Sequence, residues 1–216
     1  MVSRMTGFSS TEHGFRFVNS FQLPAALQHI LPSRSASHLG LSDLLYGLCG
    51  GMCFAALDYF HAGKPVPDVW RADEISDALF SHLVTRQVDS LRRGVVLKVL
   101  AWMARSDISL ARSVAGWEAA KVRAQVDAGQ PPVLALIRVK GLSDPMCNHQ
   151  VLATGYDYDP DTKEMAIQLY DPNHPARTPY LTMNLTRPSE GIRLTQSTGE
   201  PLRGFFVIAY TPETPP

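Results

Sequence analysis

The sequence has few cysteines, no excess of either charge and no long apolar run. Its three cysteines cannot form a complete disulfide framework, so we expect a reducing, cytoplasmic setting. Lys plus Arg and Asp plus Glu each total 20, which argues against binding of nucleic acid or an anionic membrane by charge alone. No apolar segment reaches the length of a membrane span, and the first 21 residues lack the apolar core of a signal peptide. We therefore expect neither nucleic acid nor a membrane as a partner.

A metal site is not expected from the cysteine spacing. Cys49 and Cys53 could form one pair of ligands, but no second pair at the spacing of a zinc site accompanies them. We expect no metal ion and no organic cofactor.

The order of the expected elements predicts an α+β fold. The length of 216 residues suits a single domain, and no internal repeat or low-complexity segment divides residues 1–216. Helical patterns occupy about 24–130, and strand patterns occupy about 131–211. Helices followed by strands are typical of a fold in which helices pack on a mostly antiparallel sheet.

The individual elements follow from periodicity and from Gly and Pro breaks. We expect helices at 51–63, 73–91, 94–104 (with a strand as the alternative) and 113–128, and short helical turns at 23–31. We expect strands at 133–139, 151–158, 165–170, 180–185 and 204–210, with a further one possible at 192–195. An arm with a short extended piece at 15–18, a loop at 32–42 and a frayed tail at 212–216 complete the prediction.

Cys49 has the sequence context of a reactive thiol. Two glycines follow it, and an almost wholly apolar helical run begins at Met52. We expect the glycines to give the backbone the freedom for a sharp loop-to-helix turn. The helix would then direct unpaired N–H groups and its positive dipole end toward the thiol, which stabilises a thiolate. Cys53, among apolar residues, and Cys147, close to a histidine, are the alternatives.

The residues that would activate the thiol lie at strand ends. His149 opens a strongly apolar strand, where its imidazole could take the thiol proton and later protonate a leaving group. Asp171 follows another strand and could accept the second ring N–H of the histidine. Asn173 could do the same through its side-chain oxygen, although Asp171 is nearer the strand end.

Three motifs in this order resemble the papain-like cysteine peptidase superfamily. Residues 47–52 read Gly-Leu-Cys-Gly-Gly-Met, residues 149–156 read His-Gln-Val-Leu-Ala-Thr-Gly-Tyr, and residues 169–172 read Leu-Tyr-Asp-Pro. The second resembles papain's His-Ala-Val-x-x-x-Gly-Tyr strand. The first and third are closer to the bacterial branch with a Cys-His-Asp triad that includes the double-glycine leader peptidases. The chain is also similar to uncharacterised bacterial proteins with Gly-Leu-Cys-Gly-Gly-Met and an N-terminal Gly-Phe-x-Phe-x-Asn-x-Phe, here residues 14–21.

The resemblance implies a papain-like fold and a triad of Cys49, His149 and Asp171. It implies a thiol hydrolase that cleaves a peptide or amide bond through a thioester acyl-enzyme. An amidase or acyltransferase would use the same triad. No sequence motif identifies the pocket of the protein that would select the substrate.

The sequence departs from the papain-like pattern at the residue that would complete the oxyanion hole. Papain-like peptidases carry a glutamine about six residues before the cysteine, whereas here that position is Asp43. Oxyanion donors would have to be backbone N–H groups near Cys49, such as that of Gly50, with Tyr46 or Ser42 as side-chain support. The missing glutamine keeps a second hypothesis open, namely a non-catalytic binding module on the same scaffold.

Overall fold

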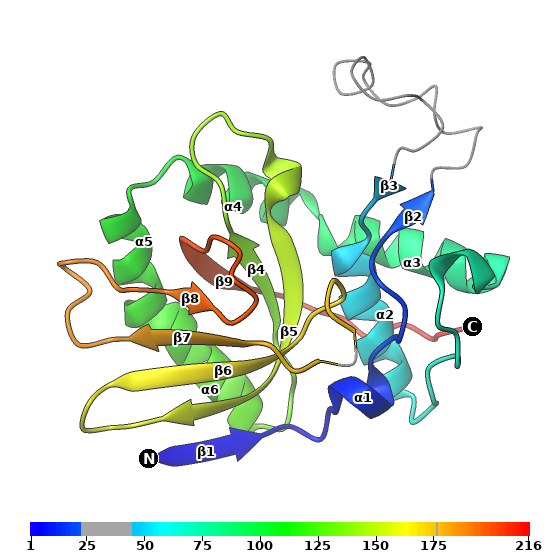
Figure 1. Ribbon diagram of the computed structural model, residues 1–216, viewed down its shortest axis with the longest axis horizontal. Coiled ribbons are helices and arrows are strands. Elements are labelled where there is room, and N and C mark those ends of the chain that lie inside the picture. The colour runs from blue at the N-terminus through cyan, green and yellow to red at the C-terminus, as the bar shows by residue number, and fades with distance from the viewer. Residues whose placement is uncertain (23–44, 176) are drawn as a thin grey trace.

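The computed structural model describes residues 1–22, 45–175 and 177–216 (Figure 1). The expected helical turns at 23–31, the loop at 32–42 and residues Ser42 and Asp43 lie outside these ranges, as does the side chain of Tyr46. In the described parts of the chain, no helix is both long enough and apolar enough to cross a bilayer.

A curled antiparallel sheet forms one part of the molecule. Within the described residues seven strands join it in the order β8-β7-β6-β5-β4-β9, and β1 pairs with β5. Their bounds are β1 Val2–Met5, β4 Val133–Ile137, β5 His149–Tyr158, β6 Glu164–Tyr170, β7 Tyr180–Asn184, β8 Thr195–Gln196 and β9 Gly204–Ile208. β6 pairs with one edge of β5, whereas β4 and β1 share its other edge, β4 at the His149 end and β1 at the Tyr158 end.

Helices cover the sheet and extend the molecule to one side. Their bounds are α1 Ser10–His13, α2 Cys49–His61, α3 Asp77–Ser90, α4 Arg93–Met103, α5 Asp107–Ser113 and α6 Ala119–Asp127, with a π-helical turn at Val114–Glu118. α6 contacts β5 and β1 and lies behind the strands in Figure 1, whereas α2 stands beside β5 and packs against α3. The short ribbon of β2 (Phe21–Gln22) and β3 (Leu45–Tyr46) lies next to the start of α2.

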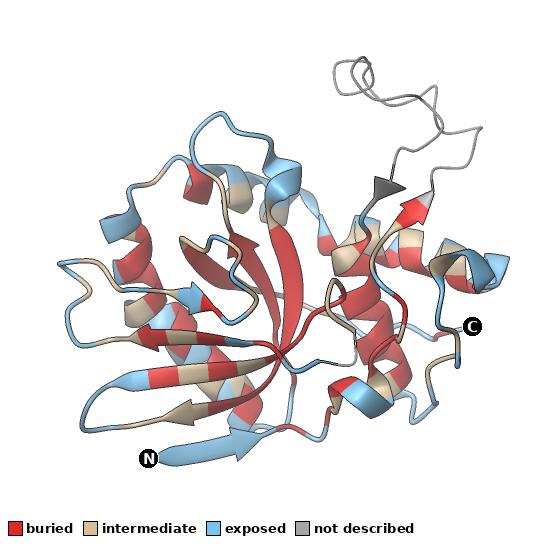
Figure 2. Ribbon diagram, in the orientation of Figure 1, coloured by how far each residue is buried: buried red, intermediate tan, exposed pale blue. Residues whose placement is uncertain are grey.

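The sequence pattern explains the core elements. α2 is buried from Gly50 to Tyr59 because it is apolar on almost every side, as Figure 2 shows. All five residues of β4 are buried, whereas β6 and β7 alternate between buried and partly exposed positions. Helices and an antiparallel sheet in one fold confirm the α+β class.

Several predicted boundaries are wrong. Residues 15–18 form no strand; instead Phe15 and Phe17 are buried, and the extended segment is β1. β1 escaped prediction because its four residues are all exposed, so it has no apolar alternation. α3 begins at Asp77 rather than at 73 because the Ser76 side chain accepts the Leu79 N–H and caps the helix.

The C-terminal segment is docked, not frayed as predicted. The Glu213 N–H donates to Oδ1 of Asp58, a carboxylate that is fully buried in α2 (2.9 Å). Lys64 Nζ donates to the Pro215 carbonyl oxygen (3.1 Å), and Arg86 donates to that of Thr211 (2.7 Å). The tail is ordered because it supplies partners to buried charges.

Candidate active site

Cys49 is the first residue of α2, and its side chain is partly exposed. The N–H groups around it have separate partners. The Leu48 N–H donates to Asn19 Oδ1 (2.5 Å) and the Gly51 N–H to Gln87 Oε1 (2.8 Å), while the Gly50 N–H is directed at the Cys49 sulfur. Among the described residues the Cys49 N–H has no hydrogen-bond partner, as is typical of the first N–H group of a helix.

The two glycines serve close packing rather than a special backbone conformation. Both lie inside α2, and neither has a positive φ, which corrects the expectation that they provide backbone freedom. A Cβ atom on Gly50 would lie 2.1 Å from Ser90 Oγ, and one on Gly51 would lie 2.2 Å from the Leu83 carbonyl oxygen. The glycines therefore let α3 approach the start of α2.

His149 and Asp171 form a buried pair. His149 Nε2 lies 2.7 Å from Asp171 Oδ1, and the two side chains are 4% and 0% exposed. Antiparallel pairing of β5 and β6 places Tyr170 opposite Leu152, which brings the residue after β6 near the start of β5.

Asp171 is held in turn by the Asn173 N–H (2.9 Å) and by Gln196 Nε2 (3.3 Å). The side chain of Asn173 bonds to Asn19 instead, so Asp171 is the group that orients the imidazole.

The second ring nitrogen of His149 faces Cys49. Because Nε2 is bonded to Asp171, Nδ1 is the nitrogen left for the hydrogen bond to the sulfur. Burial raises the pKa of Cys49, but the hydrogen bond and charge of His149 outweigh it, with help from the Gln150 and Gly50 N–H groups, so the pKa of this thiol is lowered. This environment favours the thiolate form of Cys49.

The pKa values of the His149 imidazole and the Asp171 carboxylate are shifted in opposite directions. Burial lowers the pKa of His149, yet Asp171 and Cys49 raise it by more, to about 9. Burial raises the pKa of Asp171, but its hydrogen bond and charge interaction with His149 lower it overall. The shifts of Cys49 and His149 both favour the thiolate–imidazolium form of the pair over the neutral form.

The other two cysteines do not share this environment. Cys53 is buried, its Sγ lies 3.5 Å from the Gln150 carbonyl oxygen, and burial raises its pKa well above that of a free thiol. Cys147 is exposed in the short turn Pro145–Cys147. Of the three, Cys49 is the cysteine that the structure brings to His149.

Sequence reasoning missed Asn19 as a site residue. Its backbone N–H donates to the Pro172 carbonyl oxygen (3.0 Å), and its Nδ2 donates to Asn173 Oδ1 (2.9 Å). The one signal in the sequence was the position of Asn19 in residues 14–21, which resemble the Gly-Phe-x-Phe-x-Asn-x-Phe motif of uncharacterised bacterial proteins. That resemblance assigned no role to the asparagine. Gln196, the donor to Asp171, had no signal.

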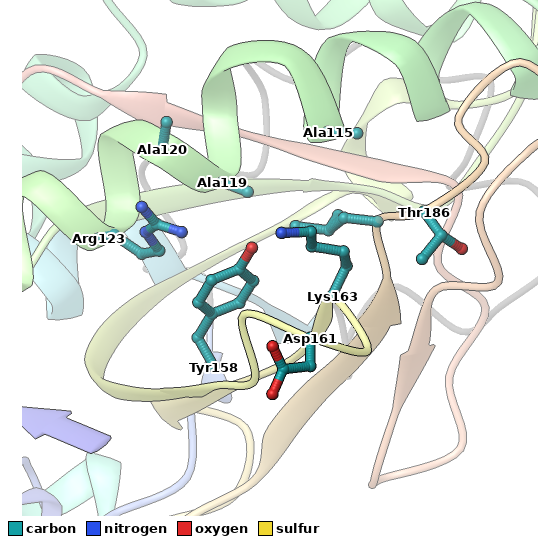
Figure 3. A pocket seen from close by; sticks show the side chains of 9 residues that line it. Ala115, Ala119, Ala120, Arg123, Tyr158, Asp161, Lys163 and Thr186 are labelled. Carbon is teal, nitrogen blue, oxygen red and sulfur yellow. The ribbon is translucent and has the colours of Figure 1, made fainter. Parts of the chain in front are cut away.

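A cavity of about 430 Å³ lies elsewhere, between α6 with the preceding π-helical turn and the hairpin of β5 and β6 (Figure 3). Its polar lining includes Arg123, Tyr158 and Lys163, and the two cationic groups point toward the tyrosine hydroxyl in Figure 3. It lies at the Tyr158 end of β5, whereas His149 is at the other end. This cavity is therefore separate from the Cys49 site.

No group of three His, Cys, Asp or Glu side chains within the described residues could hold a metal ion. Comparison of the chain with protein-family models, with curated proteins and with solved structures gave no match.

Proposed function

We propose that this protein is a cytoplasmic, thiol-dependent hydrolase of peptide or amide bonds with a papain-like fold. The observation that supports the proposal is the hydrogen-bonded series Cys49–His149–Asp171 at the N-terminus of a buried helix. The three unpaired cysteines are consistent with a reducing compartment. Asp171 orients the imidazole, His149 carries the proton, and Cys49 is the nucleophile.

The reaction proceeds in two steps, acylation of the thiol and hydrolysis of the resulting thioester. The Cys49 thiolate attacks the carbonyl carbon of the scissile amide, and a C–S bond forms as the carbonyl π electrons move to oxygen. When the tetrahedral intermediate collapses, the C–N bond breaks and the His149 imidazolium gives its proton to the leaving amine. Water then attacks the thioester carbon, losing a proton to His149, and the C–S bond breaks to release a carboxylic acid. An amine in place of water would make the enzyme an acyltransferase.

The Cys49 N–H supports oxyanion stabilisation in this scheme. It is unpaired among the described residues and lies at the positive end of the α2 dipole. The Gly50 N–H, which we expected as a donor, is directed at the sulfur and so stabilises the thiolate instead.

The first test is the pH dependence of iodoacetamide alkylation, followed at each cysteine by mass spectrometry. We expect Cys49 to react with an apparent pKa well below the ~8.5 of a free thiol, while Cys147 serves as an exposed control in the same molecule. His149→Ala should return Cys49 to ordinary behaviour. Equal reactivity of Cys49 and Cys147 at pH 6, unchanged by His149→Ala, would overturn the assignment.

A second function, a binding module without turnover, is motivated by Asp43 at the position of the usual glutamine. Incubation with p-nitrophenyl acetate separates the two functions. An enzyme should form an acetyl thioester on Cys49 that hydrolyses with time and releases p-nitrophenol repeatedly. A binding module should release no more than one equivalent of p-nitrophenol per chain.

A further inference from the structure

Asn19 connects the two parts of the chain that carry the proposed triad. Its Oδ1 accepts the N–H of Leu48, the residue before the nucleophile, and its Nδ2 donates to Asn173 Oδ1 (2.9 Å). The Asn173 N–H donates in turn to Asp171 Oδ1 (2.9 Å), the oxygen that faces His149. Hydrogen bonds therefore run from the start of α2 to the carboxylate through this one carboxamide.

The surroundings of Asn19 hold the carboxamide in place. Phe17 and Phe21, two residues to either side, are 0% and 3% exposed, so the arm is anchored by aromatic burial on both flanks. The Asn19 N–H is bonded to the Pro172 carbonyl oxygen (3.0 Å). A Cβ atom on Gly47 would lie only 2.8 Å from Asn19 Nδ2, so glycine leaves the space that the side chain occupies.

We propose that Asn19 is a positioning residue that sets the distance between the Cys49 thiol and the His149 imidazole. This proposal rests on the proposed function of the triad. Cys49 belongs to α2, whereas His149 and Asp171 belong to the sheet, so their separation depends on how the two parts are joined. A carboxamide suits this role because it accepts with its oxygen and donates with its nitrogen, whereas a carboxylate has no donor and alanine has neither.

The physical consequence is a change in the acidity of the thiol. The hydrogen bond and charge of His149 are what lower the Cys49 pKa against the effect of burial. If the link through Asn19 is removed, the start of α2 and the Asp171 turn can separate, and this interaction weakens. The pKa of Cys49 should then rise toward that of an ordinary thiol.

The test compares the alkylation profile of Cys49 in wild type, Asn19→Ala, Asn173→Ala and the double variant. Each single variant should raise the apparent pKa by about one unit and slow alkylation at pH 6 roughly tenfold, with the rate at Cys147 unchanged. Because both substitutions remove the same hydrogen bond, the double variant should be little worse than Asn19→Ala. Asn173→Ala keeps the Leu48 contact and the Asn173 backbone bond, so it remains informative if Asn19→Ala does not fold.

Asn184→Ala is the matched control. Asn184 is another partly buried asparagine, at the end of β7. It accepts hydrogen bonds from Thr186 and donates to the Thr162 carbonyl oxygen in the turn between β5 and β6, at the opposite end of β5 from His149. Its loss should leave the pH profile unchanged. An acidic Cys49 in wild type that stays equally acidic in both Asn19→Ala and Asn173→Ala, or that shifts as much in Asn184→Ala, would overturn the positioning role alone. A wild-type Cys49 that is not acidic would instead overturn the proposed function.

Discussion

His149 is the residue that links the candidate site, since it contacts both Asp171 and Cys49. Its imidazole is buried, yet its pKa is raised to about 9, while the pKa of the Cys49 thiol is lowered. A fixed carboxylate behind the ring makes this possible, because it compensates the loss of hydration around a buried cation. The charge of Asp171, and not only its shape, should therefore matter.

Asp171→Asn tests this point. The variant keeps the size of the side chain and an oxygen acceptor but removes the charge. We expect the His149 pKa to fall and the apparent pKa of Cys49 to rise, and alkylation at pH 6 should slow about tenfold for each pH unit by which the thiol becomes less acidic. Mass spectrometry of alkylated Cys49 measures the rate. Asp159→Asn, in the turn at the other end of β5, is the control and should alkylate like wild type.

At this scale the sequence predicts those residues whose context is local. Cys49 stands before glycines and an apolar helix, and His149 and Asp171 stand at strand ends, so each could be named in advance. Asn19 could not, because its bond to Asn173 joins residues 154 positions apart. Gln196 bonds to Asp171 across 25 residues and has no local pattern to distinguish it from a surface glutamine.

Among the elements, α2 and α3 are in unusually close contact through Gly51. Gly51→Ala should lower the free energy of unfolding by about 1–3 kcal/mol, because the new Cβ must displace the backbone of α3 at Leu83. Gly94→Ala in α4 is the matched control, since a Cβ there would meet nothing within 4 Å. It should stabilise the protein by roughly 0.5–1 kcal/mol. Urea unfolding measures both, and equal effects would contradict this account.

The docked tail depends on an ion pair between α2 and α3. Arg86 Nε lies 2.8 Å from Asp58 Oδ2, and the two side chains are 1% and 0% exposed. Arg86→Met should cost about 3–5 kcal/mol, because it removes the guanidinium from a buried carboxylate and leaves only His82 (3.0 Å) and Tyr210 (2.7 Å) as its side-chain partners. Urea unfolding of Arg86→Met measures this cost. A loss no larger than that of Arg187→Met, at an exposed surface pair, would show the pair to be dispensable.

Elements with strong periodicity could be predicted, whereas those held by distant partners could not. β4, β5 and β6 and the helices α2 and α4 lie where apolar runs predicted them. β1 has no buried side chain and is held by backbone bonds to Gly155–Tyr158. The C-terminal tail is likewise fixed by Asp58, a residue more than 150 positions away.

For the molecule as a whole, the buried pair of His149 and Asp171 should make stability depend on pH at both ends of the range. The Asp171 pKa is lowered, so its contribution is complete above the unfolded value of ~3.9 and is lost as the pH falls further. The His149 pKa is raised to about 9, so its contribution is complete below the unfolded value of ~6.5 and is lost as the pH rises through about 9.

Urea unfolding of wild type and His149→Ala between pH 3 and pH 10 measures this dependence. The difference in unfolding free energy should be largest between about pH 5 and 6.5 and should shrink on either side. Loss of packing at position 149 does not titrate, so it shifts the curve without changing its shape. A difference that stays constant over the whole range would contradict the linkage.

The link between Asn19 and Asn173 has a consequence for the protein during its synthesis. A growing chain on the ribosome exposes Cys49 long before residues 149–173 have emerged. Until then neither His149 nor Asp171 can reach the thiol, so the interactions that lower its pKa are absent. Contacts between residues so far apart also form late in folding. The nascent chain therefore carries an ordinary thiol, and the acidity of Cys49 appears only when the first and last thirds of the protein have met.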